Sequence, residues 1–121
     1  MTAHDAISRV DRLKYNVFSQ AEKLRWLGKL EGMLKTNILD THEGDWRFIP
    51  VSEDSPMDTP LLLQKPFDEM YIKWLEAQID LYNGELERYN ASISLFNTEY
   101  AAFESWFNRR YTPRSAGSWR P

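Results

Sequence analysis

Apolar residues recur at helical spacing in two regions near the N-terminus. A first helix is predicted over residues 2–14, with Thr2 as N-cap and Asp5 three residues later. Its apolar face is formed by Ala3, Ile7, Val10 and Leu13. A second helix is predicted to begin at the capping-box pair Ser19 and Glu22. Its apolar positions are Leu24, Leu27, Leu30, Leu34 and Ile38, while Gly28 and Gly32 share a face that would let another helix approach closely.

The periodicity stops between this helix and Pro66. Four of the six prolines lie in this region, among Asp, Ser, Thr and Gly residues. The sequence therefore predicts an extended connector over residues 42–66. Its short apolar pieces, residues 46–51 and 61–63, are expected either to pair as strands or to lie along a neighbouring surface.

The longest helical signal follows Pro66. Apolar residues alternate steps of three and four without a break, and they form a core stripe of Ile72, Leu75, Ile79, Tyr82, Leu86, Tyr89, Ile93, Phe96, Tyr100, Phe103 and Phe107. Asn83-Gly84 is typical of a turn, but a hairpin is expected to disturb the phase of the stripe, and Tyr82 to Leu86 is one more step of four. The sequence therefore predicts one long helix from about Asp68 to Arg110, with any bend at Asn83-Gly84.

The length of this helix predicts an oligomer. At about 1.5 Å per residue it would be roughly 60 Å long, whereas a compact chain of this size is about 35 Å across. The helix is thus expected to project from its own domain and to pack its stripe against other copies of the chain. The alternative is a hairpin starting at Gly84, which would give a compact four-helix unit and weaken this argument.

Length and composition favour one mainly helical domain over residues 1–112, followed by an extended tail over residues 113–121. The 121 residues include five Trp, six Tyr and six Phe, more large apolar surface than a small monomer readily buries, so part of it is expected to contact a partner. No apolar run is long enough to span a bilayer, and we expect a soluble cytoplasmic protein with no membrane contact.

Charge is distributed unevenly along the chain. A formal net charge of -3 argues against general binding to nucleic acid. The connector region is acidic, whereas no acidic residue follows Glu104. Trp and Arg are frequent interface anchors, so the basic C-terminal end is predicted to dock on another protein. The predicted docking residues are Arg109, Arg110, Arg114, Trp119 and Arg120.

Catalytic and metal-binding patterns are weak in this sequence. His42 lies close to acidic residues, but their spacing matches no metal motif, and the group is interpreted as a polar helix end and turn. His4 is interpreted as an exposed residue of the first helix. The sequence contains no Cys, no Gly-rich phosphate loop and no nucleophile elbow. We therefore expect a non-enzymatic protein without metal or cofactor.

Four segments resemble a family of phage and prophage head-to-tail adaptor, or connector, proteins. They are DAISRVDRLKYN, KLRWLGKLEG, THEG and the segment from Pro66 to Pro113, which is the most specific of them. The resemblance implies a ring of about twelve copies beneath the portal protein in the neck of the virion, assembled in the host cytoplasm. DNA would pass through this ring without specific binding. In such adaptors the C-terminal extension reaches into the portal, a role that falls here on residues 113–121.

The leading hypothesis is therefore a structural subunit of a tailed-phage neck, which contacts copies of itself, the portal protein and the next neck or tail protein. A helical regulatory module that inserts an amphipathic helix into a groove of another protein is the alternative from a different class. A scaffold or tail-chaperone role, absent from the mature particle, is a third possibility.

Overall fold

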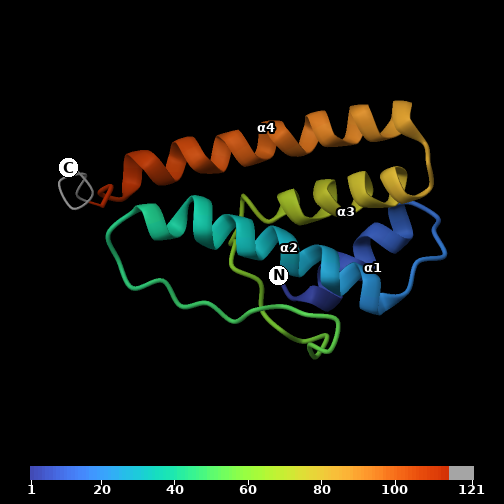
Figure 1. Ribbon diagram of the computed structural model, residues 1–121, viewed down its shortest axis with the longest axis horizontal. Coiled ribbons are helices and arrows are strands. Elements are labelled where there is room, and N and C mark those ends of the chain that lie inside the picture. The colour runs from blue at the N-terminus through green and yellow to red at the C-terminus, as the bar shows by residue number, and fades with distance from the viewer. Residues whose placement is uncertain (115–121) are drawn as a thin grey trace, which may run out of the picture.

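The computed structural model describes residues 1–114, which fold into four α-helices and one short 3-10 helix (Figure 1). The elements are α1 (Ala3–Leu13), α2 (Gln20–Asn37), η1 (Leu39–Thr41), α3 (Glu69–Tyr82) and α4 (Leu86–Arg110). Helix α3 is central, because it contacts α1, α2 and α4. Helix α4 runs antiparallel along α3, on the side away from α1 and α2. The mainly helical fold predicted from the sequence is confirmed.

The first two helices begin where their capping residues predict. The Thr2 hydroxyl accepts a hydrogen bond from the Asp5 N–H at 3.2 Å, and the Asp5 carboxylate accepts one from the Thr2 N–H at 3.0 Å. The Ser19 hydroxyl accepts from the Glu22 N–H at 3.1 Å. These bonds satisfy N–H groups that have no partner in the first helical turn.

The single long helix predicted over residues 68–110 is wrong, because the chain reverses direction after Tyr82 (Figure 1). Gly84 adopts a φ of +74°, a left-handed conformation that favours glycine. The Glu85 N–H donates to the Asp80 carbonyl at 3.0 Å and closes the turn. The turn places three residues between Tyr82 and Leu86. Two stripe residues that are four apart within a helix are separated by the same number, so the apolar spacing continues across the turn. The hairpin alternative at Gly84 is therefore the correct one.

The core stripe folds back on itself across this hairpin. Its buried members are Ile72, Leu75, Ile79, Phe96, Phe103 and Phe107. The ring of Phe96 packs on Trp74 of α3 with centroids 5.0 Å apart. Tyr82 and Leu86, next to the turn, are 60% and 63% exposed. Most of the stripe is thus buried within one molecule, so the chain has no long unsupported helix that must pack against other copies.

A buried ion pair fixes the hairpin to the N-terminal helix. Asp80 is 1% exposed, and its carboxylate accepts two hydrogen bonds from the Lys14 ammonium, at 2.7 and 2.8 Å. The Ser92 hydroxyl donates to the same carboxylate at 2.7 Å. One side chain therefore joins the end of α1 to both arms of the hairpin.

The connector runs beneath α2 and forms no strand within the described residues (Figure 1). Only isolated bridges join Thr2 to Pro60 and His42 to Pro113 there. A buried network holds the returning segment: the Tyr71 hydroxyl donates to Glu31 at 2.6 Å, and Glu31 also accepts from the Leu62 N–H at 2.9 Å. The Leu63 N–H donates to the Tyr71 oxygen at 2.9 Å. The connector thus packs against its own chain.

The two glycines of α2 are predicted to respond oppositely to alanine. A Cβ at Gly28 would overlap the backbone carbonyl of Val51, whereas a Cβ at Gly32 would meet nothing within 4 Å. Gly28→Ala is expected to lower the free energy of unfolding by about 1–2 kcal/mol, because the connector must shift. Gly32→Ala is expected to raise it by about 0.5–1 kcal/mol through helix propensity. Urea denaturation of both variants checks this, and equal effects would contradict the close approach at Gly28.

Candidate functional site

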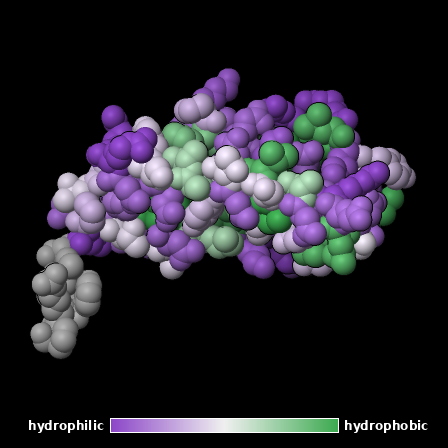
Figure 2. Space-filling view, turned by 90° about the horizontal axis from the view of Figure 1, so that it is seen from above, coloured by the Kyte–Doolittle hydropathy of each residue, from purple (hydrophilic) through white to green (hydrophobic). Residues whose placement is uncertain are grey.

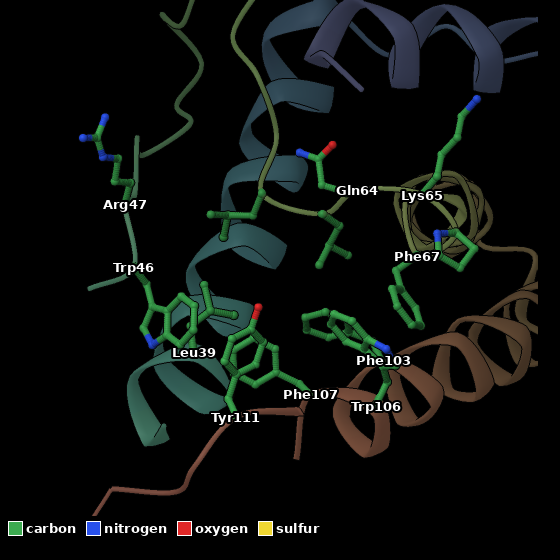
Figure 3. A pocket seen from close by; sticks show the side chains of 13 residues that line it. Leu39, Trp46, Arg47, Gln64, Lys65, Phe67, Phe103, Trp106, Phe107 and Tyr111 are labelled. Carbon is green, nitrogen blue, oxygen red and sulfur yellow. The ribbon is translucent and has the colours of Figure 1, made fainter. Parts of the chain in front are cut away.

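An aromatic pocket of about 430 Å³ opens between the connector and the C-terminal half of α4 (Figure 3). This volume lies in the range of about 300–1,000 Å³ that is typical of ligand pockets. The lining residues of the aromatic pocket are Leu39, Trp46, Arg47, Leu62, Leu63, Gln64, Lys65, Pro66, Phe67, Phe103, Trp106, Phe107 and Tyr111.

Aromatic rings from three parts of the chain support one another around this pocket. Phe67, just before α3, packs on Trp106 of α4 with centroids 5.0 Å apart. Trp46 of the connector packs on Phe107 at 5.1 Å and on Tyr111 at 4.8 Å. Edge and tilted contacts of this kind stabilise a fixed arrangement of rings. The pocket is therefore built by the packing of the connector on the last turns of α4.

The charged residues at the pocket are cationic. Arg47 and Lys65 lie at its rim, on opposite sides of the opening (Figure 3), and both are exposed. No acidic residue is found among the described residues that line the pocket. Neither cation forms an ion pair with another residue in the range 1–114. The opening thus combines apolar walls with two available positive charges.

A second pocket of about 200 Å³ continues the first along the connector. Its lining residues are Glu31, Arg47, Ile49, Pro60, Leu61 and Leu62, of which Arg47 and Leu62 also line the aromatic pocket. The two pockets therefore form one groove between residues 46–49 and residues 60–65. We call this the connector groove.

The predicted docking residues fall into three groups. Arg109 and Arg110 are exposed at the end of α4, and the Arg110 guanidinium lies 5.8 Å from the centre of the Trp106 ring. Arg114 is tied to the end of α2, because its Nε donates to the Asp40 carbonyl at 2.7 Å and its N–H to the Thr41 carbonyl at 2.9 Å. The remaining two docking residues, Trp119 and Arg120, lie outside the described residues.

Large apolar side chains are exposed at the opposite end of the hairpin, where the loop between α1 and α2 lies beside the α3–α4 turn (Figure 1). We call this surface the apolar end; its residues are Leu13, Tyr15, Val17, Tyr82 and Leu86. Tyr15 and Val17 are 87% and 79% exposed. Figure 2 shows hydrophobic surface toward this end of the molecule. Clustered exposed apolar residues commonly mark protein contacts.

The His42 region differs from its sequence interpretation. His42 is 3% exposed, and its ring packs edge-on against Phe107 with centroids 4.7 Å apart. Its Nδ1 lies 2.8 Å from the Ile38 carbonyl oxygen, whereas Nε2 has no hydrogen-bond partner among the described residues. His42 therefore lies at a helix end, as the sequence predicts, since it caps η1 and contacts the C-cap residue of α2, but it is buried in the core rather than exposed in a polar turn. Within residues 1–114, no three His, Asp or Glu side chains come close enough together to hold a metal ion.

Comparison with family models, with curated proteins and with solved structures finds no match to this chain. Proposals about function therefore rest on the geometry of the connector groove and of the two ends of the α3–α4 hairpin. None of the described helices is long and apolar enough to cross a membrane.

The connector groove is not predicted from the sequence. Trp46, Phe67 and Trp106 were not among the predicted docking or stripe residues, although the high aromatic content indicated surplus apolar surface. Phe103 and Phe107 were assigned to the stripe, and each also forms a wall of the pocket. The groove depends on how the connector folds back, and no periodic pattern in residues 42–66 indicates that path.

Proposed function

We propose that the chain is a structural subunit of a tailed-phage neck, in a head-to-tail adaptor ring beneath the portal that continues the DNA channel. The observation that carries the proposal is that the α3–α4 hairpin has two unlike ends, each suited to a different protein partner. The end of α4 is basic, with Arg109 and Arg110 exposed, and the other end is the apolar end. A subunit that joins two other proteins needs two such surfaces.

The partners in this proposal are those that the sequence resemblance implies. In this proposal the basic end and residues 115–121 contact the portal, and the apolar end contacts the next neck or tail protein. A formal net charge of -3 suits a channel through which DNA slides, because a strongly basic lining would bind phosphate. The chain acts by binding and has no catalytic role.

Native mass spectrometry of the chain mixed with the portal and the next neck protein encoded in the same gene cluster tests this proposal. We expect a complex that contains many copies of the chain. Joint Arg109→Glu and Arg110→Glu substitution, or deletion of residues 115–121, should abolish only portal binding. Joint Val17→Glu and Leu86→Glu substitution should abolish only binding to the other protein.

Exposed Lys29 on α2 provides the matched control, since Lys29→Glu changes charge away from both ends. It should leave both complexes intact. A chain that stays monomeric with both proteins, or binding that survives all three end variants, would count against the adaptor.

The regulatory alternative requires a free amphipathic helix. In this structure the apolar face of α4 packs on α3, and Phe96 and Phe103 are 3% and 4% exposed. Insertion of α4 into another protein would require the hairpin to open. No observation favours this alternative over the adaptor.

A further inference from the structure

We propose that the connector groove binds an extended acidic segment of a partner protein, with one large apolar side chain of that segment inserted into the aromatic pocket. This inference goes beyond the proposed place in a virion and does not depend on it. Three features carry it: the walls of the pocket, the charges at its rim and the free backbone of the connector.

The walls favour an aromatic or large aliphatic side chain. Phe67, Phe103, Trp106 and Tyr111 are positioned by contacts with one another, so the pocket is formed before a ligand arrives. A preformed apolar pocket binds a side chain without first ordering its own walls. Figure 3 shows these rings grouped on one side of the opening.

The rim favours carboxylates beside that side chain. Figure 3 shows Arg47 and Lys65 on opposite sides of the pocket with their charged ends directed outward, and no acid is among the described residues that line it. A ligand residue seated in the pocket would place its sequence neighbours near these cations. Charge complementarity with Arg47 and Lys65 therefore favours Asp or Glu directly beside the apolar residue at the aromatic pocket, whereas the second pocket is also lined by Glu31. The chain's own tail, residues 113–121, does not fit as the acidic ligand, because its only ionisable side chains are the basic Arg114 and Arg120.

The connector favours an extended ligand. The backbone groups of residues 45–51 form no hydrogen bond with another described residue. Residues 46–49 have no regular secondary structure, and Trp46, Arg47 and Ile49 line the groove, so the main chain there is available to pair with an extended peptide. A peptide in this position would pass both pockets in turn. A small molecule would leave these backbone groups bonded to water rather than to the ligand.

Fluorescence anisotropy with three labelled peptides of equal length tests the inference on the full chain. The first carries a central Phe with two Asp on each side in a Gly-Ser background, the second has Ala for Phe, and the third has Lys for Asp. We expect the first peptide to bind at least about tenfold more tightly than either of the others. Equal affinities, or no measurable binding of the first peptide, would overturn the proposal.

Variants and hydrogen exchange locate the bound peptide. Arg47→Glu and Lys65→Glu should each weaken binding of the first peptide about fivefold, whereas Lys29→Glu should not change it. All three positions are exposed, so the fold should be retained. The backbone N–H groups of residues 45–49 should exchange more slowly when the peptide is bound. Protection confined to the apolar end, or affinity unchanged by both rim variants, would contradict the assignment to this groove.

Discussion

Replacing Asp80 with Asn is expected to lower the free energy of unfolding by about 3 kcal/mol. The carboxylate is almost fully buried, and it accepts from Lys14 and Ser92 at 2.7–2.8 Å. An amide keeps one acceptor oxygen, but its NH₂ group would face the Lys14 ammonium, which can only donate, and the negative charge that pairs with this ammonium would be lost. The loss is placed at the lower end of the range for buried pairs because the Lys14 side chain is 21% exposed and retains some water.

The exposed pair Arg25–Glu53 provides the control for this variant. These side chains are 62% and 50% exposed, so Glu53→Gln should cost less than about 1 kcal/mol. Urea denaturation followed by Trp fluorescence measures both variants. If Asp80→Asn costs no more than Glu53→Gln, Asp80 does not hold the hairpin against α1.

Replacing Tyr71 with Phe is expected to cost about 2–3 kcal/mol at neutral pH. The hydroxyl donates to Glu31 and accepts from the Leu63 N–H, and both groups are buried. Its removal leaves a buried N–H without an acceptor and a buried carboxylate with one donor fewer, which is costly in both cases. Tyr15→Phe is the matched control, because Tyr15 is 87% exposed and the change should not alter stability measurably.

This loss is expected to depend on pH through Glu31. Burial raises the pKa of Glu31, and the hydrogen bonds from Tyr71 and from the Leu62 N–H oppose part of that rise. A carboxyl whose pKa is raised on folding binds more protons in the folded state. Its contribution to stability is therefore present below the unfolded pKa and decreases as the pH rises through the folded pKa.

Removing the Tyr71 hydroxyl raises the pKa of Glu31 further, because that hydroxyl lowers it in the native protein. The difference in free energy of unfolding between the native protein and Tyr71→Phe should therefore grow over the interval from about pH 4, near the ordinary pKa of a Glu carboxyl, upward to neutral pH and beyond the raised folded pKa. Denaturation curves across that interval measure it. A difference that is constant with pH would show that Glu31 does not depend on this bond.

The positions of the helices follow from local sequence patterns, but the way in which the helices are arranged does not. Thr2 and Ser19 cap the first two helices as their spacing predicts, because a capping bond involves residues only three apart. The sequence predicts a continuous helix through Gly84, because the apolar stripe keeps its spacing there. Asp80 ties the turn to Lys14, and these two residues are 66 positions apart in the sequence. A pattern along the chain therefore carries no signal of their contact.

The same distinction applies to the candidate sites. Arg109 and Arg110 were predicted from their clustering near the end of the chain, and they are exposed at the end of α4. The apolar end combines the loop between α1 and α2, which carries Val17, with the α3–α4 turn. These segments meet only in the folded chain, where Phe18 packs on Tyr82 with centroids 6.5 Å apart. The connector groove likewise requires that Trp46 and Phe67 lie near α4. Local composition therefore favours the prediction of an interaction protein, and tertiary packing determines where the candidate surfaces lie.

The most direct test of the proposed adaptor role is a density map of the intact virion that shows whether and where copies of this chain lie. We predict copies arranged as a ring between the portal and the tail, with the end of α4 toward the portal and the apolar end toward the tail. Absence of the chain from mature particles, or its location away from the neck, would contradict this account.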